Sequence, residues 1–172
     1  NSLLNSARLV NHTNEVALKV ENVISILKDA ETGQRGYLLT HDEVFLEPYY
    51  GAYEKVLRSI DDVQKITADN PVQQVNCDQL KGLAQKRFNM LTSAINIYHV
   101  TGLASDSTLL EGKLKMDAVR ILVDSMKNEE NRLLEIRTGK LNQFTRSTPI
   151  LILIASLLAI IITIVSVIRV VN

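Results

Sequence analysis

Apolar residues recur every three or four positions along most of this chain, and this spacing limits what it can fold into. One stripe consists of Val16, Val20, Val23, Leu27, Ala30, Gln34 and Tyr37. Apolar side chains at such intervals lie on one face of an α-helix, whereas a half-buried strand needs strict alternation. The sequence therefore predicts an all-α protein.

Three short breaks, at residues 40–42, 69–71 and 102–106, interrupt the helical pattern. They contain residues suited to helix caps and first turns, namely Asp42, Asp69, Asp106, Pro71 and Gly102. The predicted helices span residues 2–40, 42–69, 71–102 and 106 onward. Because short connections make neighbouring helices antiparallel, we expect an up-down-up-down four-helix bundle. Pro48 should kink the second helix or mark its true start, because proline lacks an amide hydrogen.

Two glycines interrupt a strongly helical segment near the end of the first predicted helix. Gly33 and Gly36 leave the backbone uncovered, which allows a neighbouring helix or a ligand to approach closely. Glu31 and Arg35 are spaced for an ion pair along the helix, and Gln34 continues the apolar stripe into the core. Two interpretations stay open: a buried polar lock that fixes helix register, or a ligand pocket.

A candidate site follows from residue heights along the predicted helices, which bring polar and aromatic residues together in the half of the bundle far from the chain ends. Tyrosines combine an apolar ring with a hydroxyl group, and with arginines and carboxylates they can form a small pocket for an anionic or amide ligand. The alternative is a closed network that stabilises one register and binds nothing. The residues are Glu31, Gln34, Arg35, Tyr37, Tyr49, Tyr53, Tyr98, Asp117 and Arg120.

Residues 149–168 form a run without charge. A helix of this length, at about 1.5 Å per residue, covers roughly the hydrocarbon thickness of a bilayer. We therefore predict a bundle at 1–148, a transmembrane helix at 149–168 that is continuous with the fourth helix, and the start of a cytoplasmic segment at 169–172. Small residues repeat along the span, at Ala155, Ser156, Ala159, Thr163 and Ser166. They favour either packing against another membrane helix or a plain anchor.

The charges on the two sides of the predicted span conflict with a cytoplasmic location for residues 169–172. Arg137, Lys140 and Arg146 precede the span and only Arg169 follows it. By the positive-inside rule this count places residues 1–148 in the cytoplasm. Because neither end of the sequence has the features of a natural terminus, we expect flanking segments to decide the orientation.

Composition and motifs exclude several classes of function. The 19 Lys and Arg balance 19 Asp and Glu, so the chain lacks the excess positive charge that nucleic-acid binding needs. Cys77 is the only cysteine and forms no internal disulfide. His12, His41 and His99 lie far apart in the sequence, so we expect no metal site. The sequence has no phosphate-binding loop, catalytic nucleophile motif or paired catalytic carboxylates, and we expect neither enzymatic activity nor a cofactor.

The segment at residues 29–40, DAETGQRGYLLT, resembles the third class of CHASE domains. The resemblance extends to residues 12–16 and 45–49, to Met116, Asp117 and Arg120, and to Glu130, Leu133, Leu134 and Arg137, and it covers about residues 10–140. It implies a periplasmic or extracellular four-helix sensory bundle between two spans of an inner or plasma membrane, which feeds a cytoplasmic kinase, cyclase or chemotaxis output. Glu15, Glu130 and Arg137 then belong to a polar stalk near the membrane.

We therefore expect a membrane-anchored sensory input domain in which ligand or partner binding shifts the fourth helix and the attached span. The expected partners are the lipid bilayer, a second copy or another membrane protein, and an unidentified small ligand. The alternative is a single-span structural or docking subunit of a larger membrane assembly. A kinase or cyclase module after Asn172 would support the sensor, whereas a stop codon soon after it would support the docking subunit.

Overall fold

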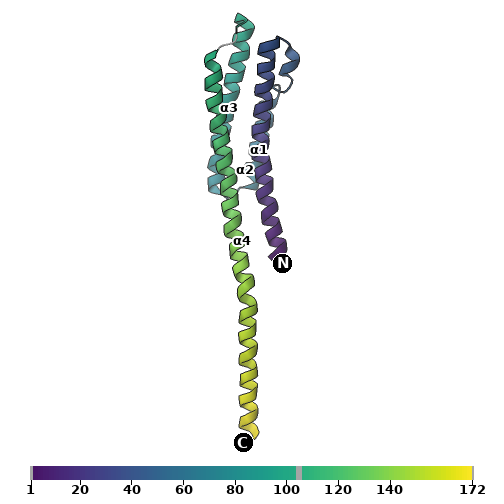
Figure 1. Cartoon of the computed structure of the whole chain (residues 1–172), viewed down its shortest axis with the longest axis vertical. Helices are drawn as coiled ribbons and strands as arrows, with labels where there is room; N and C mark the ends of the chain where they lie inside the picture. The colour runs from purple at the N-terminus through teal and green to yellow at the C-terminus, as the bar shows by residue number, and fades with distance from the viewer. Residues whose placement is uncertain (1, 104–105, 172) are drawn as a thin grey trace. The chain divides into compact units, whose positions relative to one another are not determined.

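The computed structural model describes the backbone of residues 2–103 and 106–171, and the side chains of residues 4–103, 111–139, 152–163 and 166. Five helices follow one another, as Figure 1 shows: α1 (Ser2–Thr40), the short 3-10 helix η1 (Glu43–Leu46), α2 (Ala52–Ile66), α3 (Pro71–Thr101) and α4 (Asp106–Val171). No strand occurs in the backbone that is described. The all-α prediction is confirmed.

The chain divides into two compact units, one of residues 12–131 and one of residues 1–11 with 132–172. In the first unit, α1, α2, α3 and α4 all contribute to one apolar core, and consecutive helices run antiparallel (Figure 1). Val20, Val56, Leu80 and Val119, one from each helix, are fully buried. Residues 12–131 thus form a four-helix bundle, and we call this unit the bundle.

The second helix is shorter than predicted. Instead of one helix over 42–69, η1 covers Glu43–Leu46 and α2 runs from Ala52 to Ile66. Pro48 has no amide hydrogen to donate, and Gly51 has a left-handed φ of 68°, so a continuous helix cannot pass through both residues. The prediction of an unbroken helix is wrong, and the alternative, that Pro48 marks the approximate start of the main helix, is closer to the structure.

Helix caps account for the remaining boundaries. The Asp42 side chain accepts a hydrogen bond from the Val44 amide at 3.0 Å, and Gly102 ends α3 with a φ of 68°. Asn70, and not the predicted Asp69, caps α3, because the Asn70 side chain accepts hydrogen bonds from the first amides that follow Pro71. The predicted cap at Asp106 lies outside the described side chains.

The predicted membrane span is not confirmed. Within the residues that the structure describes, no helix is long and apolar enough to cross a bilayer. Part of the predicted span, at residues 149–151, 164–165 and 167–168, lies outside the described side chains, as do residues 169–172. The backbone of α4 is helical from Asp106 to Val171, as predicted for the fourth helix.

Candidate functional site

The glycine pair of α1 accommodates η1 and the turn that follows it. A Cβ atom added at Gly33 would overlap the carbonyl oxygen of Phe45 and lie 3.3 Å from Cδ of Pro48. One added at Gly36 would lie 2.6 Å from the Phe45 ring. Of the two partners expected from the sequence, a neighbouring segment or a ligand, the structure places a neighbouring segment of the same chain against both glycines.

Next to this contact, a carboxylate on α1 bridges two arginines. Glu31 lies 2.6 Å from Nη2 of Arg35, its neighbour along the helix, and 2.8 Å from Nη2 of Arg87 on α3. Arg87 is only 5% exposed, whereas the Arg35 side chain is half exposed. Because a buried guanidinium needs a counterion, Glu31 is the group that makes burial of Arg87 tolerable.

A glycine on α4 and a very small cavity complete the surroundings of Arg87. A Cβ at Gly112 would lie 2.8 Å from Nη1 of Arg87, so the guanidinium packs closely against the backbone of this glycine. Nε of Arg87 is buried and has no hydrogen-bond partner among the described residues. Beside it, Gln34 helps to line a cavity of about 20 Å³, which is the space of one water molecule and not of a larger ligand. Glu31, Arg35 and Arg87, which we call the Glu31 cluster, therefore leave no room for a ligand larger than water, as expected for a polar lock.

The tyrosines lie in two separate groups. Tyr49 and Tyr53 pack against Phe88 of α3, with ring centroids 6.2 and 5.2 Å from that of Phe88, and the Tyr49 hydroxyl lies 2.6 Å from Oγ1 of Thr92. Together with Tyr50 they border a cavity of about 280 Å³. This group is the part of the predicted site that has room for a small molecule.

The second tyrosine group lies where α1 and α3 end. Tyr37 is buried and its hydroxyl lies 3.3 Å from the imidazole nitrogens of His99. Its ring packs edge-on against Tyr98, with centroids 5.6 Å apart, and Tyr98 in turn stacks on and hydrogen-bonds His41. These aromatic contacts join the ends of α1 and α3.

Asp117 and Arg120 form a local cluster on α4. Asp117 lies 2.7 Å from Nη1 of Arg120 and 3.2 Å from Nζ of Lys113. The hydrogen bond from Lys113, supported by the one from Arg120, lowers the pKa of Asp117. All three partners belong to α4, so this part of the predicted site joins no two helices. Glu31, which was predicted to belong to the same site, pairs with Arg35 and Arg87 and not with Arg120.

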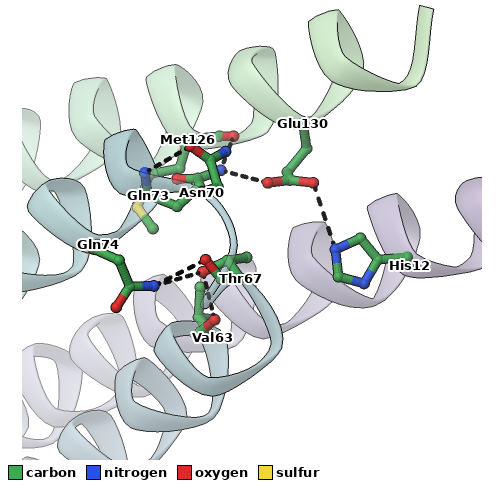
Figure 2. Close-up of polar contacts among 8 residues, drawn as sticks. All are labelled: His12, Val63, Thr67, Asn70, Gln73, Gln74, Met126 and Glu130. Atoms are coloured by element: carbon green, nitrogen blue, oxygen red, sulfur yellow. Dashed lines mark hydrogen bonds and ion pairs between the residues drawn. The ribbon is translucent and has the colours of Figure 1, made fainter. Parts of the chain in front are cut away.

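A buried polar contact joins α4 to the start of α3 (Figure 2). Glu130 is 1% exposed, and its Oε1 accepts a hydrogen bond of 2.9 Å from Nε2 of Gln73, which is fully buried. The same Nε2 donates to the carbonyl of Met126 at 2.9 Å. Nε2 of His12, on α1, lies 3.9 Å from the other carboxylate oxygen of Glu130. Side chains from α1, α3 and α4 thus meet at one carboxylate.

Hydrogen bonds within the α2–α3 turn hold Gln73 in place (Figure 2). The Thr67 hydroxyl donates to the carbonyl of Val63 at 2.8 Å, and Nε2 of Gln74 donates to the carbonyl of Thr67 at 2.9 Å. Oδ1 of Asn70 accepts from the Gln73 amide at 3.4 Å. Because the turn is cross-linked in this way, the Gln73 side chain has a fixed base from which to reach α4.

The other predicted site residues are dispersed. Glu15 is exposed in the bundle, whereas Arg137 belongs to the unit of residues 1–11 and 132–172, where it has an interaction partner. The predicted packing residues of the span are exposed in this single chain: Ala155, Ser156, Ala159, Thr163 and Ser166. The hydroxyls of Ser156 and Thr163 donate to carbonyls of their own helix, at 2.9 and 2.8 Å.

Two residues of these clusters were missed from the sequence, Arg87 and Gln73. Both lie on the apolar stripe of α3, together with Cys77, Leu80 and Ala84. A polar residue at a stripe position is the signal that identified Gln34 on α1, and the same criterion applied to α3 would have identified both.

Comparison with known proteins identifies the family of this chain. The CHASE3 domain model matches residues 6–140, more than half of the chain. No curated protein matches the chain, and no solved structure matches it. CHASE3 domains are extracytoplasmic sensory modules of signalling receptors and are not catalytic. The match covers the whole bundle with its glycine pair and its two buried polar clusters. This chain belongs to the CHASE3 domain family.

Proposed function

We propose that this chain is the sensory input domain of a membrane-bound receptor, in which ligand or partner binding to the bundle shifts α4 relative to α1. The observation that carries the proposal is the match of residues 6–140 to a sensory domain family. A shift of α4 is then passed to a cytoplasmic output module. A ligand drives such a shift only if it binds one helix arrangement more tightly than the other.

The contacts that hold α4 in the bundle support a change between discrete positions. Apolar core contacts are non-directional and tolerate small shifts, whereas hydrogen bonds and ion pairs select particular registers. Lys127 of α4 lies 3.1 Å from Glu21 of α1, and Glu130 bonds Gln73 of α3. If α4 moves along its axis, both polar contacts must break together and re-form elsewhere, which favours two states over a continuum.

Membrane anchoring is part of the proposal, and its support comes from the sequence. Residues 149–168 carry no charge, and the small residues among them suit close packing with a second membrane helix. A homodimer is the simplest arrangement that uses this packing.

Cross-linking α1 to α4 tests the proposed shift. In a fusion of the chain to a histidine kinase output module, Glu21→Cys and Lys127→Cys are joined by a short bismaleimide. We expect kinase activity to change about fivefold or more on cross-linking, within the usual range of coupling between sites. The native Cys77 does not compete, because burial raises its pKa to about 11 and keeps its thiol protonated and covered at neutral pH.

A matched pair between α2 and α3 serves as the control. Asp61 and Lys81 form a partly exposed ion pair of 2.7 Å between these helices, comparable to that of Glu21 and Lys127. Cross-linking Asp61→Cys to Lys81→Cys should leave kinase activity within about twofold, because α4 stays free to move. Equal effects of the two cross-links would contradict a specific role for the α1–α4 contact.

Alkaline extraction of membranes tests the anchor. The 172-residue chain is expected to stay in the membrane pellet at high pH, whereas a chain that ends at Thr148 is expected in the supernatant, because only the former carries the uncharged run. Equal release of both chains would show that residues 149–168 do not anchor the protein.

A further inference from the structure

The cavity beside the start of α2 has an unusual lining. Its volume is about 280 Å³, near the lower end of the range for small-molecule sites. Three of its lining residues are tyrosines, Tyr49, Tyr50 and Tyr53, and Phe88 forms a further wall. These rings lie at 5.2 to 6.2 Å from one another in the contacting pairs. The cavity therefore presents several aromatic surfaces to whatever enters it.

Much of this aromatic surface is not used by the core. Tyr50 is 59% exposed, although its ring packs against that of Tyr49 at a centroid distance of 5.9 Å. Gly51, with its left-handed φ of 68°, makes the turn that brings Tyr49 and Tyr50 to the same cavity as Tyr53. Core packing explains Phe88 but leaves the ring of Tyr50 in solvent.

The charge of the cavity is negative. Glu54 is the only acidic or basic side chain in its lining, and it forms no ion pair with any residue that the structure describes. Arg35 and Arg120, which were predicted to lie with the tyrosines, do not line the cavity. Asn89 adds an exposed amide at the rim. An anionic ligand would meet Glu54 without a compensating cation, whereas a cation gains from both Glu54 and the ring faces.

We propose that this cavity binds a small organic cation, with an ammonium or quaternary ammonium group held against the rings of Tyr49, Tyr50 and Tyr53 and neutralised by Glu54. Aromatic faces attract cations through their quadrupole, and a neighbouring carboxylate adds a charge–charge interaction. The role of this cation as the input signal of the receptor rests on the sensory function proposed above. Binding itself does not depend on that function.

Titration with two isosteric probes tests the ligand class. Choline and 3,3-dimethylbutan-1-ol have nearly the same shape, but only choline is charged. Because three of the five tyrosines line this cavity and the chain has no tryptophan, tyrosine fluorescence responds to its occupancy, and calorimetry gives the stoichiometry. We expect choline to bind one site and the neutral alcohol to bind about tenfold more weakly or not at all. Equal affinities, or no binding of choline, would overturn the proposal.

Variants locate the site. Tyr50→Leu removes an exposed ring and should weaken choline binding about tenfold, whereas Tyr50→Phe keeps the ring and should stay within about twofold. Glu54→Gln should weaken binding by a similar factor, and Glu43→Gln, an exposed carboxylate on η1 outside the cavity lining, should change nothing. Circular dichroism confirms folding of each variant. Binding that survives both Tyr50→Leu and Glu54→Gln would place the cation elsewhere and overturn the assignment.

A third probe separates a free amine from a lipid headgroup. Glycerophosphocholine carries the same cation next to a phosphate, which Glu54 repels. Tighter binding of choline assigns the site to free amines, and tighter binding of glycerophosphocholine assigns it to headgroups; either result supports a cation site. The cross-linking of α1 to α4 tests the sensory function and uses no ligand, whereas choline titration tests only the cavity. Failure of one proposal is therefore distinguished from failure of the other.

Discussion

Replacing Glu31 with alanine is expected to lower the free energy of unfolding by about 3 kcal/mol, because it leaves the buried Arg87 without a counterion. For a chain of this length, that loss corresponds to a decrease in melting temperature of about 10 °C. Arg87→Met should cost less, because Glu31 retains its ion pair with Arg35 at the surface. Urea unfolding followed by circular dichroism measures the free energy of unfolding of the unchanged chain and of both variants.

Two controls make this prediction specific. Arg120→Ala breaks an exposed pair on α4 and should cost less than about 1 kcal/mol. The double variant Glu31→Ala with Arg87→Met removes both charges of this ion pair, and it should be more stable than Glu31→Ala alone. If Glu31→Ala costs no more than Arg120→Ala, Arg87 finds an alternative partner or solvent, and the Glu31 cluster is not the lock of this bundle.

Gly33→Ala is expected to destabilise the protein by about 3 kcal/mol, the upper range for overpacking, because its new methyl group overlaps a backbone carbonyl oxygen. Gly36→Ala should cost less, since the overlapping group is the exposed ring of Phe45, which can rotate away. Phe45→Ala should therefore rescue Gly36→Ala but not Gly33→Ala. Chemical denaturation of the single and double variants measures these differences.

Gly82 provides the matched control on α3. A Cβ atom there meets nothing within 4 Å, so Gly82→Ala should raise stability by about 0.5 to 1 kcal/mol through helix propensity alone. If Gly33→Ala also stabilises the protein, η1 does not pack against α1 as described, and the glycine pair has another role.

Much of the fold follows from local sequence rules. The first and third helices begin and end within a residue of their predicted limits. For the third helix, the reason is that Pro71 and Gly102 act through their own backbone preferences. Glu31 and Arg35 pair as their spacing predicts, and Gln34 is buried at the stripe position where it was expected. These features depend only on residues that are close in sequence.

The candidate site was less predictable, because heights along helices say nothing about the direction of side chains. Tyr49 and Asp117 were placed at similar heights, yet Tyr49 packs on α3 while Asp117 pairs only within α4. The pairing of Arg87 with Glu31 depends on how α1 and α3 are rotated about their axes. The spacing of residues in the sequence does not predict that rotation.

Periodicity, helix caps and the 29–40 segment are local patterns, and they were sufficient to predict the helical class, the order of the helices and the family. Three features are visible only in the folded chain: the partner of the glycine pair, the burial of Arg87 and Gln73, and the separation of the tyrosine cavity from the arginines. Each of these is a contact between residues far apart in the chain. Such contacts are fixed by the packing of whole helices, which minimises voids and unpaired buried charge together.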